Sequence, residues 1–352
     1  MKEFWSGRIR GLTPYTPGEQ PRDRQFIKLN TNENPYPPSP RALEAIRAAA
    51  GEGLRLYPDP EGAALRRALA ELHGLRPEQV FVGNGSDEVL AMCFMAFFDR
   101  DLVFPDVSYS FYPVYADLFH IPHREIPLDG EFGLDVADYL GNNGGVVVAN
   151  PNAPTGRALP LADIVRLLEG NPEVVVLVDE AYVDFGGASA VELIGSYPNL
   201  VVVRTMSKSR SLAGLRVGYA LGSGNLIAAL NCVKDSFNSY TLDRLALAGA
   251  EASVRDAGYF QATLEKVVRT RAWAAQRLAE LGFRVCPSAA NFLFVSHERV
   301  DAKTLLDGLR ARGILVRWWD KPRIRNYLRI TVGTDAEMEA LCEALSGLTA
   351  EG

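Results

Sequence analysis

The chain has 352 residues, of which 47% are apolar and 23% charged, and its net charge is −6. This length allows two domains with a large buried core. The acidic balance argues against a nucleic-acid partner, which needs a basic face, although it permits a small anionic ligand.

Cysteine and histidine are too scattered in this chain to suggest a metal. The four cysteines lie far apart without a C-x-x-C pair, so we expect neither a disulfide framework nor a zinc site. No stretch approaches the apolar length of a membrane span, so we expect no membrane partner. The first residues lack the apolar centre of a signal peptide, and we therefore expect a cytoplasmic protein.

Residues 1–40 are rich in proline, asparagine and charge, as in TPYTPGEQPRDRQ and NTNENPYPPSP. Such a composition cannot form a core by itself, so we expect an extended N-terminal arm. The run SPRALEAIRAAAGEG follows, with a serine cap, a proline at the first helical position and a helical period, and it predicts the first helix.

Residues 41–250 alternate between helical and strand patterns. We expect helices over 63–74, 86–98 and 161–170, and strands over 79–84, 101–106, 144–151, 173–180 and 199–205. The apolar runs VVVA, VVVLV and LVVV do not alternate with polar residues, so both faces of these strands must be covered. The pattern predicts a large α/β domain in which helices sandwich a mostly parallel sheet.

Residues 251–352 predict a smaller α+β domain. Two successive helices, over 241–254 and 258–281, lead into it, and the second is long enough to bridge domains. Strands follow over 291–296, 314–319 and 327–333, with helices over 302–313 and 335–348.

Ligands of open parallel sheets bind beyond the carboxyl ends of the strands, so the polar residues there are candidates for a site. The run VFVGNGSDEVLAM places Gly85 and Ser86 between a strand and a helix, where the first helical amides favour a phosphate. A tight turn with Ser86 or Asp87 as the helix cap accounts for the same residues. Asn150 and Asn152, in VVVANPNAPTG, equally suit a structural turn.

A third strand end carries acidic residues. The run VVVLVDEAYVDF ends its strand in Asp179 and Glu180. A carboxylate there is costly to bury unless a metal, a helix or a protonated ligand nitrogen is its partner. Tyr182 follows closely enough to reach the same ligand.

Lys208, in TMSKSRSLAGLRVGY, follows another strand. No glycine precedes it within ten residues, so it does not belong to a nucleotide-binding loop of the G-x-x-x-x-G-K type. It is either a solvated loop lysine or, in a partly desolvated cleft, a nucleophile for a carbonyl. Thr205 and Ser207 offer hydroxyl donors, and Arg216 suits either a phosphate or a surface ion pair.

Together these signals describe one ligand with three parts. Its carbonyl would face Lys208 and its ring nitrogen would face Asp179. Its phosphate would lie against Gly85, Ser86, Thr205, Ser207 and Arg216. Pyridoxal 5′-phosphate has these three parts, so we expect it as the cofactor.

The chain resembles the fold-type I pyridoxal-phosphate aminotransferases, and in detail the histidinol-phosphate aminotransferase subfamily. The motifs that carry the resemblance run in family order from near residue 12 to residue 334: LNTNENPYPPSP, YPDPEG, GNGSDE, NPNAPTG, VDEAYVDF, TMSKSRSLAGLRVGY, KDSFNSYTLDRLA and VRWWDKPRIRNYLRITVGT. The resemblance implies the fold-type I architecture and a transamination of histidine biosynthesis. In that reaction L-histidinol phosphate and 2-oxoglutarate give imidazole acetol phosphate and L-glutamate.

The resemblance also implies a role for each matched residue. Lys208 would bond covalently to the cofactor and shuttle a proton, and Asp179 would keep the ring nitrogen protonated. Around the ring, Tyr182 and Asn152 would bond its hydroxyl, Tyr109 would stack on it and Asp87 would join the cofactor site. Tyr57 would reach the phosphate in a neighbouring subunit, which implies a homodimer with shared active sites. Arg329 would grip the α-carboxylate of glutamate, while Tyr15, Asn32 and Arg317 are candidates for binding the phosphate of the amino alcohol.

The chain departs from the subfamily pattern at two places. It has Asn152 followed by Ala153 where many relatives have two asparagines, and Trp318 with Trp319 where we expect tyrosine and phenylalanine. Two other activities stay open: a threonine-phosphate decarboxylase, which has nearly the same scaffold, and an aromatic aminotransferase, which the two tryptophans favour. A ligand-sensing regulator would need an added DNA-binding domain, for which the chain has neither the length nor the charge.

Overall fold

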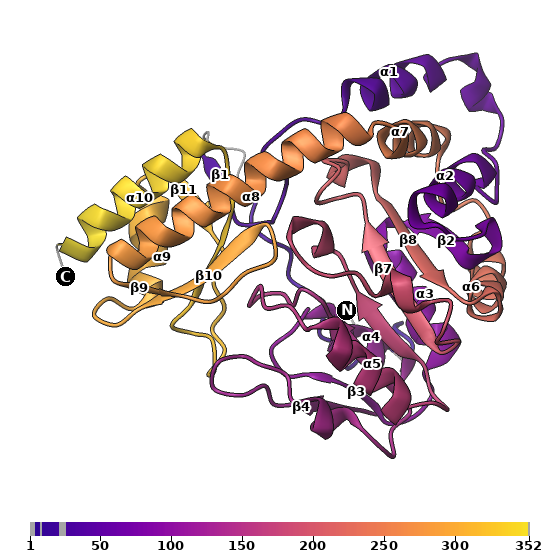
Figure 1. The fold of residues 1–352 in the computed structure, drawn as a ribbon, viewed down its shortest axis with the longest axis horizontal. Helices are drawn as coiled ribbons and strands as arrows, with labels where there is room; N and C mark the ends of the chain where they lie inside the picture. Colours follow the sequence, from indigo (N-terminus) through magenta and orange to yellow (C-terminus); the bar gives the residue numbers. More distant parts are fainter. Residues whose placement is uncertain (1–3, 8, 21–25, 351–352) are drawn as a thin grey trace.

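The computed structural model describes residues 4–7, 9–20 and 26–350, so part of the arm expected over 1–40 lies outside the described residues. Figure 1 shows a large unit built around a sheet and a smaller C-terminal unit, with the long helix α8 (Ala257–Glu280) running between them. Both units match the α/β and α+β architectures expected from the sequence.

The large unit contains a sheet of seven strands. In spatial order they are β2 (Val80–Asn84), β8 (Val217–Gly222), β7 (Leu200–Thr205), β6 (Val176–Asp179), β5 (Gly145–Ala149), β3 (Leu102–Pro105) and β4 (His123–Ile126). The neighbours from β7 to β4 are parallel, whereas β8 runs antiparallel to both β7 and β2. The sheet is thus mostly parallel, as predicted.

Helices cover both faces of this sheet. One face packs against α2 (Ala63–His73), α5 (Leu161–Gly170) and α7 (Arg244–Arg255), and the other against α3 (Gly85–Phe97), α4 (Phe111–Phe119) and α6 (Gly224–Phe237). Successive residues of β5 face opposite ways, because Val147 belongs to one core while Val146 and Val148 belong to the other. This burial on two faces explains the uninterrupted apolar runs in the sequence.

The smaller unit surrounds a three-stranded antiparallel sheet. Its strands are β9 (Phe283–Val285), β10 (Phe292–His297) and β12 (Leu328–Thr331), with β10 in the middle. Helices α8, α9 (Ala302–Ala311) and α10 (Asp335–Ala350) pack on it.

The N-terminal arm contributes one strand to this smaller unit. Strand β1 (Ile27–Leu29) pairs in parallel with β11 (Ile314–Val316), and Leu29 is buried in the core of the unit. The arm therefore has no core of its own, but it joins one. Helix α7 still packs against the large sheet, so we propose that the two units meet between α7 and α8, close to the division expected at residue 250.

Helix α1 (Pro40–Ala49) begins at the predicted cap, because the Ser39 side chain accepts a hydrogen bond from the Ala42 amide. It packs against α7. Short 3₁₀ helices complete the described chain at Glu52–Arg55, Pro77–Gln79, Val136–Tyr139, Val183–Phe185, Ala190–Leu193 and Ala213–Leu215.

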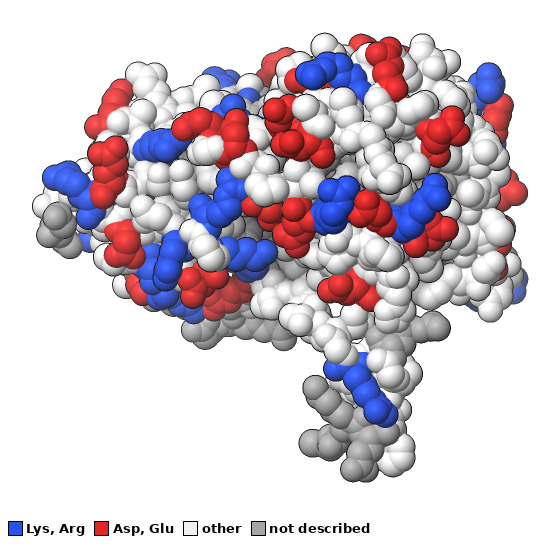
Figure 2. Space-filling model, turned by 90° about the horizontal axis from the view of Figure 1, so that it is seen from below, with Lys and Arg blue, Asp and Glu red and all other residues white. Residues whose placement is uncertain are grey.

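Acidic and basic side chains alternate over the face shown in Figure 2, with no extended basic surface on that face. Among the described residues, no helix combines the length and the apolar character that crossing a membrane requires. Within the same residues, no three His, Cys, Asp or Glu side chains are grouped so that they could hold a metal ion.

Candidate active site

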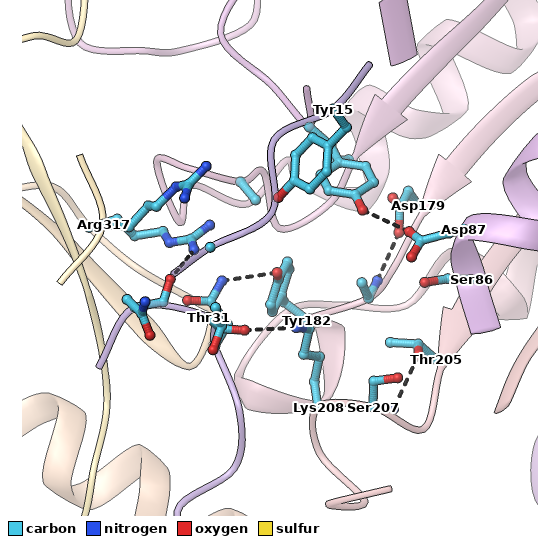
Figure 3. Close-up of a pocket in the computed structure, with 18 of the residues that line it drawn as sticks. Tyr15, Thr31, Ser86, Asp87, Asp179, Tyr182, Thr205, Ser207, Lys208 and Arg317 are labelled. Atoms are coloured by element: carbon cyan, nitrogen blue, oxygen red, sulfur yellow. Dashed lines mark hydrogen bonds between the residues drawn. The ribbon is translucent and has the colours of Figure 1, made fainter. Parts of the chain in front are cut away.

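A pocket lies at the carboxyl ends of β6 and β7, where both units and the arm meet (Figure 3). Most residues predicted from the sequence line it. These are Tyr15, Asn32, Ser86, Asp87, Tyr109, Asp179, Tyr182, Thr205, Ser207, Lys208, Arg216, Arg317 and Arg329. The parallel strands bring their ends to one edge of the sheet, and the small unit adds the last two arginines from the opposite side.

Asp179, the last residue of β6, is buried without a cation. Its carboxylate accepts hydrogen bonds from the Tyr112 hydroxyl at 2.9 Å and from the Ala181 amide at 3.1 Å. No ion pair to it occurs in the described part of the chain. Burial raises the pKa of Asp179 to about 6. A carboxylate in this state gains from a ligand that brings a protonated nitrogen.

Arg216 and the start of α3 form a cradle for an anion. Gly85 has φ +80°, and a Cβ atom there would lie 2.3 Å from Arg216 Nη2, so only glycine allows this approach. Arg216 donates to the Ser207 hydroxyl at 3.2 Å, and its Nη2 lies 3.4 Å from an Asp87 carboxylate oxygen. Ser86 lies in the first turn of α3, and the backbone amides of that turn favour negative charge.

Lys208 lies in the pocket beside Thr31 and Tyr182 (Figure 3). Its Nζ donates to the Thr31 carbonyl at 3.2 Å and lies 5.8 Å from the centre of the Tyr182 ring. No carboxylate lies within ion-pair distance of Nζ among the residues that the structure describes. The amine is thus held by neutral groups, as a nucleophile toward a carbonyl requires.

Asn32 links the arm to the site. Its Nδ2 donates to the Tyr182 hydroxyl at 3.0 Å, and its Oδ1 accepts from the Thr331 hydroxyl at 3.0 Å. Asn32 has φ +56° and is buried, so the surrounding bonds hold it in a left-handed conformation. We expected it beside the substrate, and the structure shows that its amide also positions Tyr182.

Arg329, in β12, has no acidic partner in the described chain. Its Nη2 donates to the Asn30 carbonyl at 3.0 Å, while its inaccessible Nε has no hydrogen-bond partner. Arg317 follows β11 and exchanges backbone hydrogen bonds with Arg329, so the two guanidinium groups enter the pocket together. Tyr15 lines the same end, stacked on Phe111 with 4.3 Å between the ring centres. This end suits anionic substrate groups.

Three predicted cofactor residues, Gly85, Asn152 and Tyr57, do not line this pocket, although Gly85 lies beside it against Arg216. Asn152 donates both amide hydrogens within the protein, to the Val107 carbonyl at 2.9 Å and the Thr155 hydroxyl at 3.0 Å. Tyr57 lies away from the pocket with 78% of its surface exposed, and its ring stacks on Tyr240. Its predicted role needs a second subunit and stays a prediction.

Sequence reasoning missed Tyr112 and Thr31, which contact Asp179 and Lys208. Tyr112 sits in the aromatic stretch SYSFYPVY, which is typical of a buried core, and nothing in that stretch marks its hydroxyl. Thr31 acts through its carbonyl, which no side-chain pattern can reveal. Tyr109 was predicted, and its hydroxyl donates to Asp87 at 2.7 Å.

Comparisons with known proteins show the family to which the chain belongs. The family model described as aminotransferase class I and II matches residues 24–345. The chain belongs to the class I and II aminotransferases. It is 57% identical over 351 residues to the histidinol-phosphate aminotransferase of Aromatoleum aromaticum, covering 98% of this chain and 99% of that protein. It is 56% identical over 352 residues to histidinol-phosphate aminotransferase 1 of Methylococcus capsulatus, covering 99% of each.

A solved structure extends the likeness of this aminotransferase to three dimensions. The crystal structure of histidinol-phosphate aminotransferase from Sinorhizobium meliloti in complex with pyridoxal-5′-phosphate matches with a TM-score of 0.84 and 26% identity. The match covers 93% of this chain and 92% of that one. The family and fold class expected from the sequence are thereby confirmed.

Proposed function

We propose that this aminotransferase moves the amino group between L-histidinol phosphate and 2-oxoglutarate, yielding imidazole acetol phosphate and L-glutamate in histidine biosynthesis. The observation that carries the proposal is the arrangement of charge in one pocket. A buried carboxylate, Asp179, and the amine of Lys208 lie opposite two arginines that have no acidic partner among the described residues. The near full-length identity to two histidinol-phosphate aminotransferases supports the same substrate pair.

The residues present fit pyridoxal 5′-phosphate as the cofactor. Among the described residues Asp179 has no cationic partner, and a ring nitrogen would provide one. Arg216 lies against Gly85 at the start of α3 and donates to Ser207, so its guanidinium is placed to bind a phosphate. Ser86, Thr205 and Ser207 would add hydroxyl donors there. When bound, the cofactor supplies an aldehyde that joins amines and a ring that withdraws electrons from the adjoining carbon.

The chain's own groups then perform the proton chemistry. Lys208 Nζ is held by a carbonyl and not by a carboxylate, so it can give up and accept a proton at the substrate carbon. Asp179, fixed by Tyr112, keeps its charge near the bound ring and favours a protonated nitrogen there. Tyr182 lines the pocket, and Asn32 orients its hydroxyl there.

The two substrates use the arginine end of the pocket. The Arg329 fork would bind the α-carboxylate of glutamate, because its Nε is buried and lacks a partner. Arg317 and Tyr15 would bind the phosphate of the amino alcohol, since both line this end and, among the described residues, the Arg317 guanidinium donates to two carbonyls of the arm and to no carboxylate.

The protein would act as a cytoplasmic homodimer with shared sites. Tyr57 and Tyr240 stack on each other on the surface, and Leu54 and Leu56 are more than half exposed beside them. Exposed apolar groups clustered in this way are typical of an interface. Their place near the predicted phosphate ligand Tyr57 supports a second copy of the chain as the partner.

A substrate panel with the purified, cofactor-loaded protein tests the proposed reaction. We expect glutamate to form from 2-oxoglutarate with L-histidinol phosphate as the preferred donor, and phenylalanine to have a much lower kcat/KM as donor. Release of carbon dioxide from threonine phosphate without an amino acceptor would instead establish the decarboxylase. A higher kcat/KM for phenylalanine would establish the aromatic aminotransferase.

A further inference from the structure

One indole ring lies against both substrate-binding arginines. The centre of the Trp319 ring is 5.3 Å from Arg317 Cζ and 5.1 Å from Arg329 Cζ. Trp319 also lines a second chamber, which adjoins the active-site pocket and shares Tyr15, Tyr109 and Arg329 with it. The ring therefore lines the space next to the arginines, where a substrate bound to them would lie.

The adjacent tryptophan faces the other way. Trp318 packs against the core of the small unit, and its indole nitrogen donates to the Arg325 carbonyl at 2.7 Å. Only one residue of the unusual pair thus contacts the two guanidinium groups. Alternation along an extended segment explains the difference, because successive side chains point to opposite faces.

The groups that hold the two arginines are neutral. Arg317 donates to the carbonyls of Thr16 and Pro17, and Arg329 donates to the carbonyl of Asn30. No carboxylate pairs with either arginine in the described part of the chain. Burial lowers the pKa of Arg329, and the charge of Arg317 acts in the same direction.

An aromatic ring is suited to this position. Its face attracts a guanidinium group without neutralising it, whereas a carboxylate would compete with the anionic substrate. A ring shared by two like charges also keeps the two side chains in fixed places. Fixed side chains lose less conformational freedom when an anion binds.

We propose that Trp319 is a positioning residue for both half-reactions, holding Arg317 and Arg329 as two separate anion sites on one indole ring. The proposal rests on the proposed function for the identity of the two anions, phosphate and carboxylate. It also explains why a single substitution at this position would alter the binding of two chemically different substrates. Arg317 and Arg329 themselves each serve mainly one of them.

The test compares holoenzyme variants at the two tryptophans. Trp319→Leu removes the aromatic face and Trp319→Phe keeps one, while Trp318→Leu is the matched control on the opposite face. We expect Trp319→Leu to raise the KM for L-histidinol phosphate and for glutamate, each by about 2- to 10-fold, with little change in kcat. Trp319→Phe should recover most of both losses, and Trp318→Leu should change neither KM.

Equilibrium binding separates this proposal from the proposed function. Calorimetric titration of the holoenzyme with inorganic phosphate and with glutarate measures the two anion sites even if L-histidinol phosphate is not turned over. Weaker binding of both anions in Trp319→Leu, recovered in Trp319→Phe, supports the positioning role. Unchanged binding, equal losses in the leucine and phenylalanine variants, or the same loss in Trp318→Leu would overturn it.

Discussion

Arg204 and Glu180 form a buried ion pair directly beneath the active site, with 3.0 Å between Nε and Oε2. Arg204 precedes the last residue of β7, and Glu180 follows the last residue of β6. Arg204 also reaches Asp184, whose other oxygen accepts a hydrogen bond from Ser209. The network therefore ties the loop that carries Lys208 to the strand end that carries Asp179.

Loss of this arginine should destabilise the protein strongly. Arg204→Met leaves Glu180 and Asp184 without their cation, and an uncompensated buried charge costs about 3–5 kcal/mol. Denaturant unfolding measures the loss. Arg166→Ala is the matched control, because Arg166 pairs with Asp163 on the exposed surface of α5, where a pair contributes at most about 1 kcal/mol. Equal losses in the two variants would contradict a structural role for the network.

Asp179 should make the cofactor-free protein less stable as the pH rises. Its folded pKa, about 6, lies above the ordinary value of 3.8, so the folded protein binds more protons between these values. Stability is then highest at low pH and falls until the pH passes about 6, by at most about 3 kcal/mol. Asp179→Asn should remove this loss.

Unfolding titrations of cofactor-free protein at two pH values check the sign of this effect. At pH 8, the unfolding free energy of Asp179→Asn should exceed that of the unchanged protein by up to about 3 kcal/mol, and at pH 5 by about half as much. The same variant should lose about 10²–10³-fold in kcat when loaded with cofactor, because the role of the carboxylate is electrostatic. A variant that is less stable at pH 8 would refute the burial argument.

The parallel strands at the centre of the sheet could be predicted because each is encoded by a short, continuous stretch of sequence. Uninterrupted apolar runs demand cover on both faces, and β5, β6 and β7 form where these runs occur. Strand β8 was not predicted, because glycines at its second and last positions, Gly218 and Gly222, interrupt the strand pattern of VGYALG. Gly218 is needed there for a reason that lies far away in the sequence. A Cβ atom at this position would lie 2.4 Å from the Gly85 backbone.

The candidate site also contains some residues whose place local sequence patterns predict and others whose place they do not. Asp179 and Thr205 lie at the ends of predicted strands and Lys208 follows one, so their convergence follows from the parallel order of the sheet. The bond between Asn32 and Thr331 joins the two ends of the chain, and no local pattern encodes it. Helix α4 was also missed, since its aromatic residues lack a helical period of polar and apolar residues and Pro113 interrupts the stretch; its Tyr112 hydroxyl contacts Asp179 only in the folded chain.

Arg329→Lys should impair glutamate binding far more than turnover. Lysine keeps the positive charge but replaces the planar fork, which can form two hydrogen bonds to one carboxylate, with a single point of charge. We expect the KM for glutamate to rise about 10- to 100-fold, as for the loss of a charge-assisted bond. Arg325→Lys is the control, because Arg325 is exposed and forms a surface ion pair with Asp320, with 3.5 Å between Nη2 and Oδ1. An equal effect of both substitutions on KM would refute the assignment.

Lys208→Ala should abolish transamination and leave no cofactor covalently attached. Its Nζ is the amine that lies in the pocket without a carboxylate partner, so no other described lysine can replace it there. Borohydride reduction of the loaded protein, followed by peptide mass spectrometry, should find the reduced cofactor on Lys208 and on no other residue. Lys303→Ala, which removes an exposed pair with Asp307 on α9, should keep both the label and the activity. A label on any other lysine would show that the site is assigned wrongly.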